Sequence, residues 1–188
     1  MSEKQIGNWR RLSIETRYEN PWIKVTHQQV ITPGGSNGIY GVVHFHNRAV
    51  GVIPVDEFGN TWLVRQTRYP LEQQTWEIPE GGAPMAEDLL SAAKRELEEE
   101  VGLLASHWQP LLNIHTSNSV TDEYGTVFLA TGLSAGQQQL EDSEDIAVHK
   151  MPLQQAIDMV MDGTITDSLS VAGLLKLAVL QQRGTISF

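Results

Sequence analysis

The stretch of sequence that decides the fold is GGAPMAE at residues 81–87, followed after seven residues by RELEEEVGL at residues 95–103. Apolar residues recur here at every fourth position: Leu89, Ala93, Leu97 and Val101. Residues at this spacing share one face of a helix, and a glycine such as Gly102 just beyond them is a common helix stop. The sequence therefore predicts an amphipathic helix over residues 86–101, preceded by a glycine-rich loop.

The same helix carries a cluster of carboxylates. At 100° per residue, Glu96, Glu99 and Glu100 share one face beside the apolar stripe, whereas Glu98 falls on the opposite side. Like charges at this spacing destabilise a helix by about 0.2–0.5 kcal/mol per pair, and at a C-terminal turn they also oppose the helix dipole. A divalent cation would compensate, because Mg²⁺ binds carboxylate oxygens and water and leaves positions for a substrate phosphate. Arg95 precedes Glu99 by four residues and can pair with it, and the alternative interpretation is a solvated acidic face.

Composition limits the classes of protein to which the chain can belong. The 188 residues are 40% hydrophobic and 19% charged, which is ordinary for one globular domain with an extension. Thirteen bases and 23 acids leave a net charge of −10, which disfavours nucleic-acid and membrane-surface roles. The absence of cysteine excludes disulfides, thiolate zinc sites and cysteine nucleophiles. Since neither a secretory signal nor an apolar membrane span is recognisable, we expect a soluble cytoplasmic protein.

The rest of the chain alternates extended and helical patterns. Segments rich in β-branched and aromatic residues predict strands at 22–25, 28–32, 39–45, 50–55, 61–66, 109–117 and 126–131. The turn-forming residues 33–38 predict a hairpin, residues 134–145 are too polar for a core, and apolar stripes predict helices at 153–161 and 171–180. This order favours an α/β/α sandwich with an N-terminal β extension.

The spacing of the two motifs matches every fixed position of the Nudix box, so the chain resembles a Nudix hydrolase. Three further motifs are similar to the ADP-ribose pyrophosphatase branch, namely VRQTRYP at 64–70, WEIP at 76–79 and TDE at 121–123. The resemblance implies a Nudix α/β/α sandwich with a mixed sheet at residues 49–188. It also implies an N-terminal antiparallel β extension at residues 1–48, for dimerisation and for covering the substrate. A homodimer is expected independently, because these few strands cannot bury a core alone.

This branch implies Mg²⁺-dependent hydrolysis of the pyrophosphate bond of ADP-ribose or a related nucleoside diphosphate sugar, with Mn²⁺ as a possible substitute. The products would be a nucleoside monophosphate and a sugar phosphate. GDP-mannose, UDP-sugars and diadenosine polyphosphates stay open as substrates, because composition does not separate them. A non-catalytic nucleotide-sugar sensor on the same fold is the alternative from another class. Such a sensor should carry a broken box, whereas the Glu99–Glu100 pair is intact.

Metal ligands follow from the resemblance: Glu96, Glu99, Glu100, the backbone carbonyl of Glu80 and, in support, Glu87. Glu80 departs from the pattern, since a small residue usually precedes the first glycine of the box. Its carboxylate is therefore either neutral in effect or alters the metal site or the substrate range. Glu144 is the candidate base, because this branch places a mobile acidic residue in that loop, and Glu141 is the neighbour most easily confused with it. Glu144 as a solvated loop residue is the alternative.

Substrate contacts are expected from two regions. Arg68 is expected to clamp the diphosphate or to bind the terminal sugar. Arg65 is the weaker candidate, because side chains alternate faces along a strand and Arg65 is an odd number of residues away. Trp22 and Tyr18 lie in the extension that resembles the nucleoside-covering segment of this branch. The alternatives are a surface role for the arginines and a core role for the two aromatic residues.

Overall fold

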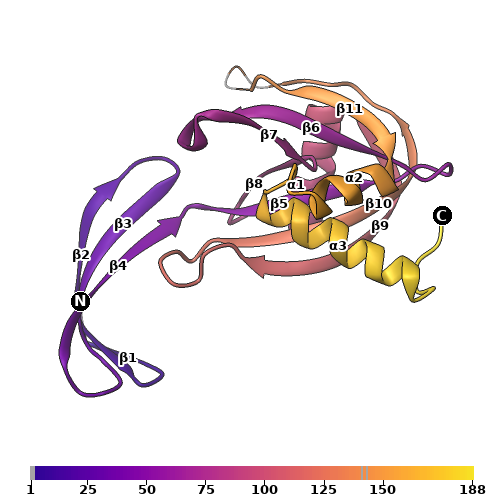
Figure 1. Cartoon of the computed structure of the whole chain (residues 1–188). Helices are drawn as coiled ribbons and strands as arrows, with labels where there is room; N and C mark the ends of the chain where they lie inside the picture. Colours follow the sequence, from indigo (N-terminus) through magenta and orange to yellow (C-terminus); the bar gives the residue numbers. More distant parts are fainter. Residues whose placement is uncertain (1–2, 141, 143) are drawn as a thin grey trace. The chain divides into compact units, whose positions relative to one another are not determined.

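The computed structural model describes residues 3–140, 142 and 144–188. The chain divides into two compact units, whose helices and strands are labelled in Figure 1. Unit 1 comprises Met1–Arg48 and His115–Tyr124, and unit 2 comprises Ala49–Ile114 and Gly125–Phe188. The inclusion of His115–Tyr124 in unit 1 was not anticipated from the sequence. Within the described residues, no helix has both the length and the apolar character needed to span a bilayer.

Unit 1 is built on a four-stranded antiparallel sheet in the order β1-β2-β3-β4. Its strands are β1 (Lys4–Ile6), β2 (Trp9–Glu19), β3 (Ile23–Ile31) and β4 (Asn37–Phe45). The hairpin predicted around residues 33–38 is confirmed, because it joins β3 to β4 and its Gly35 has the positive φ that the turn requires. The predicted N-terminal antiparallel β extension is therefore correct.

The segment His115–Tyr124 is bonded to β4. The amide of Val43 donates to the carbonyl of Val120 at 2.9 Å, and the Tyr40 hydroxyl donates to the carbonyl of Ser119 at 2.6 Å. His44 Nδ1 lies 2.6 Å from Asp122 Oδ2. Burial tends to raise the pKa of Asp122, but hydrogen bonds from His44 and the Phe45 amide outweigh it and leave the pKa lowered.

Unit 2 contains two further sheets, in the orders β8-β5-β10-β9 and β11-β6-β7. The strands are β5 (Asn47–Pro54), β6 (Asn60–Arg68), β7 (Gln73–Glu77), β8 (Glu80–Pro84), β9 (Leu103–His115), β10 (Tyr124–Ala135) and β11 (Ala147–Pro152). The helices are a 3₁₀ turn (Tyr69–Leu71), α1 (Leu89–Glu96), a π turn (Leu97–Val101), α2 (Leu153–Met161) and α3 (Ser168–Gln182). Parallel pairing of β5 with β10 beside antiparallel pairing of β6 with β7 and β11 makes the architecture mixed.

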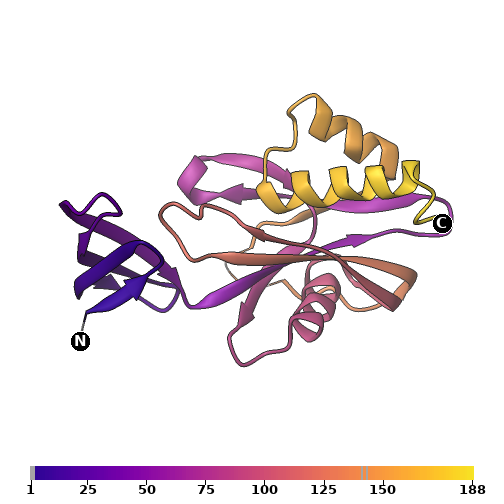
Figure 2. The ribbon, with the colours of Figure 1, turned by 90° about the horizontal axis from the view of Figure 1, so that it is seen from below.

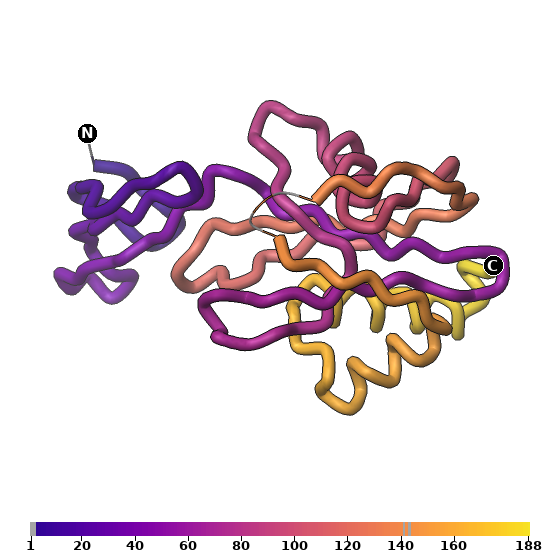
Figure 3. Tube along the Cα trace, turned by 90° about the horizontal axis from the view of Figure 1, so that it is seen from above, coloured from indigo at the N-terminus to yellow at the C-terminus, as the bar shows by residue number. Residues whose placement is uncertain are grey.

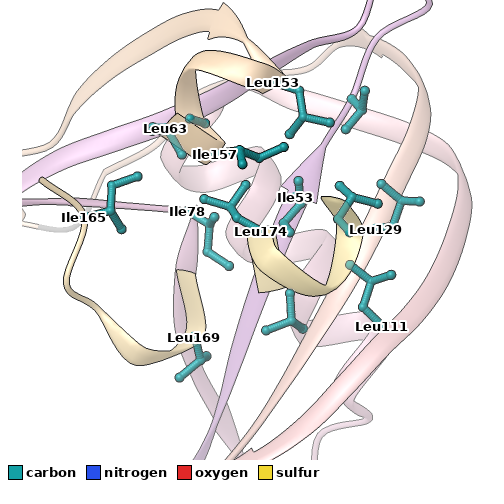
Figure 4. Packing of buried hydrophobic residues seen from close by; sticks show 14 of the residues in the cluster. Ile53, Leu63, Ile78, Leu111, Leu129, Leu153, Ile157, Ile165, Leu169 and Leu174 are labelled. Atoms are coloured by element: carbon teal, nitrogen blue, oxygen red, sulfur yellow. The ribbon is translucent and has the colours of Figure 1, made fainter. Parts of the chain in front are cut away.

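Helices cover both faces of the layer formed by the strands of unit 2. In Figures 2 and 3, α1 lies on one side of the strands, and α2 and α3 lie on the other. Strand alternation explains the two cores, because Val50 and Val52 of β5 pack with α1 while Ile53 and Val55 pack with α2 and α3. Figure 4 shows the second core, where side chains of the strands meet those of α2 and α3. The predicted α/β/α sandwich is confirmed.

The principal helix differs from its prediction in its start and in the form of its last turn. It begins at Leu89 rather than at residue 86, because the Asp88 side chain accepts a hydrogen bond from the Ser91 amide and caps the first turn. Its last turn, Leu97–Val101, is a π turn, so the 100° spacing does not hold there. Gly102 ends the helix with φ 72°, as the sequence predicted.

Candidate active site

The acidic cluster is assembled at the junction of α1 and the π turn. Arg95 joins its members, since Arg95 Nη1 lies 2.8 Å from Glu96 Oε1 and 2.9 Å from Glu99 Oε2. Arg95 Nη2 also donates to Glu87 Oε2 at 3.2 Å and to the carbonyl of Gly82 at 2.9 Å. Arg95 therefore pairs with Glu99 as the sequence predicted, and it also connects strand β8 to the helix.

Glu96 lies directly against Gly81, which belongs to strand β8 and not to a loop as the sequence predicted. A Cβ built on Gly81 would overlap the Glu96 carboxyl group, so a side chain at position 81 requires that carboxylate to move. Burial raises the pKa of Glu96 to about 7; the charges of Glu99 and Glu144 also raise it, and Arg95 opposes the shift. The close approach of strand β8 to the helix thus explains the glycine at the start of the motif.

We expect Gly81→Ala to displace the Glu96 carboxylate from Arg95 and to raise the Mg²⁺ concentration for half-maximal activity about tenfold. The Mg²⁺ dependence of initial rates measures this effect. Gly34→Ala is the matched control, because its Cβ would meet only Thr32 Oγ1 at an ordinary 3.9 Å. An unchanged Mg²⁺ requirement in Gly81→Ala, with the melting temperature preserved, would show that the position of Glu96 does not matter.

Glu100 is the buried member of the cluster, with 1% of its surface exposed. Its Oε2 accepts a hydrogen bond from the backbone amide of Glu80 at 2.9 Å. Burial raises the pKa of Glu100 to about 9; the charges of Glu96 and Glu144 also raise it, while the Glu80 amide and the charge of Arg68 oppose the shift. A cation beside such a buried carboxyl would lower its pKa, because the cation favours the ionised form.

These shifts predict that the metal-free protein loses stability as pH rises. Glu96 and Glu100 titrate near 7 and 9 in the folded state but near 4.5 when unfolded. The folded state therefore binds more protons over this range, and the free energy of unfolding falls from about pH 5 to pH 9. Urea denaturation in a chelator measures the decline, and Glu100→Gln should reduce its slope. Mg²⁺ binding should tighten with rising pH, because protons leave on binding. A pH-independent stability would contradict the account.

A second polar network holds the segment that precedes Gly81. Glu77, only 2% exposed, accepts from Arg68 Nε at 2.8 Å, from Gln66 Nε2 at 3.1 Å and from Thr75 Oγ1 at 2.6 Å. Arg68 Nη2 also lies 2.6 Å from Glu80 Oε1. The guanidinium of Arg68 is thus held by two carboxylates at the edge of the acidic cluster.

Helix α3 contacts the same segment, at Ile78, through Ser170. The Ser170 hydroxyl accepts from the Ile78 amide at 2.9 Å and donates to Asp167 Oδ2 at 2.8 Å. Burial raises the pKa of Glu80 well above its usual value, and the nearby charges of Asp167 and Glu77 add to this, while Arg68 opposes it. The unusual carboxylate at position 80 therefore belongs to this network, while its backbone amide contacts Glu100.

The candidate base Glu144 lies within electrostatic reach of the cluster. Its charge contributes to the raised pKa values of Glu96 and Glu100, after the larger contribution of burial. The alternative base, Glu141, lies outside the described residues. The predicted loop is confirmed over its described part, although β10 extends to Ala135.

The other predicted contact residues are Arg65 in unit 2 and Trp22 and Tyr18 in unit 1. Arg65 projects from the face of β6 opposite to Arg68, with its guanidinium carbon 5.6 Å from the centre of the Trp76 ring. Trp22 and Tyr18 belong to unit 1 and are 68% and 55% exposed, so the alternative that they are core residues of this chain is wrong. Sequence reasoning missed the roles of Glu77 and Ser170, and only the WEIP motif signalled Glu77.

The cluster fits a hard divalent cation. As the side chains stand, no group of three or more His, Asp or Glu residues in the described part is close enough to hold an ion. Arg95 instead supplies the positive charge between Glu96 and Glu99, and the buried Glu100 carries a raised pKa. Because all the donors are oxygen and Arg95 already marks a position that requires positive charge, the residues suit Mg²⁺ or Mn²⁺ rather than a soft metal.

Comparisons with known proteins agree with this geometry. The NUDIX domain model matches residues 45–168, and the model of the nucleoside diphosphate sugar hydrolase N-terminal domain matches residues 9–43. An ADP-ribose pyrophosphatase of Mycobacterium tuberculosis is 35% identical over 89% of this chain and 82% of its own. A methanol dehydrogenase activator of Bacillus methanolicus is 29% identical over 86% of this chain and 88% of its own.

The fold comparison points the same way. A crystal structure of an ADP compounds hydrolase superposes with a TM-score of 0.85 at 20% identity and covers 97% of this chain and 100% of its own. At that identity the superposition shows the fold alone, whereas the domain match and the mycobacterial relative show membership of a family. The chain therefore belongs to the Nudix hydrolase family, whose members generally depend on a divalent metal.

Proposed function

We propose that this protein hydrolyses the pyrophosphate bond of ADP-ribose or a related nucleoside diphosphate sugar in a Mg²⁺-dependent reaction, in which Mn²⁺ can substitute. The observation that carries the proposal is the convergence of Glu96, Glu99 and Glu100 around Arg95 and the Glu80 amide. The relationship to a mycobacterial ADP-ribose pyrophosphatase supports the substrate class. The products are a nucleoside monophosphate and a sugar phosphate.

Each residue of the cluster has a role in this proposal. Metal ions, when bound, neutralise charge on the diphosphate and make a water molecule more acidic. Glu96, Glu99, Glu100 and the Glu80 carbonyl hold them, Glu87 supports the loop, and Arg95 orients Glu99. Glu144 takes a proton from the attacking water. As this happens, the water oxygen bonds to phosphorus and the bridging phosphorus–oxygen bond breaks.

Substrate binding is assigned to two regions. Arg68 donates to the diphosphate or to the terminal sugar, and the carboxylates of Glu77 and Glu80 hold it in place. Arg65 is the weaker candidate, because it lies on the other face of β6. Trp22 and Tyr18 stack on or cover the nucleoside, and their exposure in unit 1 supports this role.

We further propose a cytoplasmic homodimer in which residues 1–48 form the dimerising and substrate-covering domain and residues 49–188 form the hydrolase domain. The net charge of −10 argues against nucleic-acid partners. Sedimentation analysis of the full chain should give twice the monomer mass of 20.9 kDa. A fully active monomer would contradict the proposed homodimer.

A screen of nucleotide sugars tests the function. With Mg²⁺ present and a phosphatase that releases phosphate from the products, ADP-ribose or a close relative should be hydrolysed faster than GDP-mannose, UDP-glucose and diadenosine polyphosphates. A chelator should abolish the activity, and Mg²⁺ or Mn²⁺ should restore it. Binding of nucleotide sugars without turnover under all these conditions would favour a sensor instead.

A further inference from the structure

The loop that carries Glu144 begins with hydrogen bonds to the C-terminal end of the helix that bears the predicted metal ligands. The Gln139 amide donates to the carbonyl of Glu99 at 2.9 Å, and Gln138 Nε2 donates to the carbonyl of Glu100 at 2.7 Å. The Gly136 amide donates to the carbonyl of Gly102 at 2.8 Å. These bonds satisfy carbonyls that the end of a helix leaves free, so the loop begins on the residues that bear the predicted metal ligands.

The end of the loop is fastened to strand β6 by Asp145. Its Oδ1 accepts from the backbone amide of Thr67 at 2.8 Å, and its Oδ2 accepts from the Thr67 hydroxyl at 2.6 Å. These two bonds lower the pKa of Asp145, so its carboxylate is ionised at neutral pH. A carboxylate that receives two hydrogen bonds from one residue is fixed in direction as well as in place.

The position of Asp145 follows from the register of the sheet. β11 pairs with β6 so that Ala147 faces Arg65, and continuing this antiparallel register by two residues places Asp145 opposite Thr67. The pairing of β11 with β6 ends at Ala147. Beyond it, the Asp145 side chain accepts the hydrogen bond from the Thr67 amide that a strand carbonyl would otherwise accept. The backbone can therefore leave the sheet at this point without leaving that amide unsatisfied.

We propose that Asp145 is a positioning residue, which together with Thr67 holds the end of the loop and so keeps Glu144 in place beside the acidic cluster. This proposal rests on the function proposed above, in which Glu144 is the base. Glu144 is the immediate neighbour of Asp145, in the loop whose start is bonded to the carbonyls of Glu99 and Glu100. Because general-base catalysis requires the base within hydrogen-bond reach of the water, loosening this attachment reduces turnover more than substrate binding.

The experiment compares steady-state kinetics of Asp145→Ala, Thr67→Val and Thr67→Ser in the full chain with ADP-ribose and saturating Mg²⁺. Asp145→Ala and Thr67→Val should each lower kcat about tenfold with KM within twofold, and Thr67→Ser should keep near-parental kcat because it retains the hydroxyl. Asp142→Asn is the matched control, since it changes an exposed acid of the same loop and should be silent. Melting temperatures establish that each variant is folded.

A double-mutant cycle with Glu144→Gln separates positioning from general damage. If Asp145 acts through Glu144, then Asp145→Ala lowers kcat no further in the Glu144→Gln background. Full additivity, or a silent Asp145→Ala in an enzyme that Glu144→Gln disables, overturns the positioning role and leaves the proposed base intact. A silent Glu144→Gln overturns the base and the positioning role together, while Mg²⁺-dependent hydrolysis by the parent still supports the wider function.

Discussion

Replacing Glu100 with glutamine lowers kcat by a factor of at least ~10² at saturating Mg²⁺, because a catalytic metal loses a charged ligand. Glu99→Gln has an effect of the same size for the same reason. The fold should tolerate Glu100→Gln, since the raised pKa of Glu100 keeps this carboxyl largely protonated at pH 7 without metal, and glutamine has the same shape and charge. At Glu99, the change also relieves repulsion from neighbouring carboxylates.

Steady-state kinetics and Mg²⁺ titration calorimetry measure this pair of variants. Glu98→Gln is the matched control, since it removes a charge from the same acidic run. Its side chain lies near Gly136, outside the Arg95 network. The variants at positions 99 and 100 should bind Mg²⁺ more weakly, whereas Glu98→Gln should bind it as the parent does. Full activity of both variants at saturating Mg²⁺ would remove the metal-site assignment.

Glu144→Gln is the second change with a large expected effect. If Glu144 takes the proton from the attacking water, the variant loses ~10²- to 10⁴-fold in kcat with KM nearly unchanged, which is the range for losing a general base. A carboxylate base should also make kcat of the parent fall towards low pH, and this acid limb should be weakened or displaced in the variant. The pH profile of kcat is therefore the second measurement.

Glu141→Gln and Asp142→Asn serve as controls for this variant, because they alter charge in the same loop. Both should retain near-parental kcat. If Glu141→Gln loses activity while Glu144→Gln keeps it, Glu141 is the base instead. If neither variant loses activity, water activation depends on the metal and the helix carboxylates alone.

Local patterns predicted the parts of the fold that depend on local interactions. The apolar stripe from Leu89 to Val101 placed the principal helix, and Gly102 placed its end, because helix periodicity and left-handed capping act over a few residues. The turn at residues 33–38 was found for the same reason. The start of α3 was missed by three residues, although Asp167, whose side chain accepts from the Ser170 amide, is a recognisable helix cap.

Long-range contacts decided what the sequence did not predict. Strands β7 and β8 are short and have no alternating pattern of their own, so their pairing depends on neighbours. Glu77 and Arg68 meet because two antiparallel strands bring them together, and Ile78 meets Ser170 across 92 residues. The π turn widens the helix where Glu98, Glu99 and Glu100 lie, which an ideal helical wheel does not represent.

The site residues that belong to the sequence motif were predictable. The residues that hold them in position were not. Glu96, Glu99, Glu100 and Arg95 were named from the sequence, and the structure brings them together. Asp145 was not named, because its partner Thr67 is 78 residues away and a loop aspartate has no local signal. The functional roles of all these residues stay predictions until the variants are measured.

The most direct test of metal-dependent pyrophosphate hydrolysis at this acidic cluster is ³¹P NMR of ADP-ribose incubated with the parent protein and with Glu100→Gln. With Mg²⁺ and the parent, the diphosphate signals should be replaced by two monophosphate signals of equal area, from AMP and ribose 5-phosphate. The same sample with a chelator, or with Glu100→Gln, should show little or no conversion. Persistence of the diphosphate with the parent and Mg²⁺, or equal conversion by the parent and Glu100→Gln, would contradict the account.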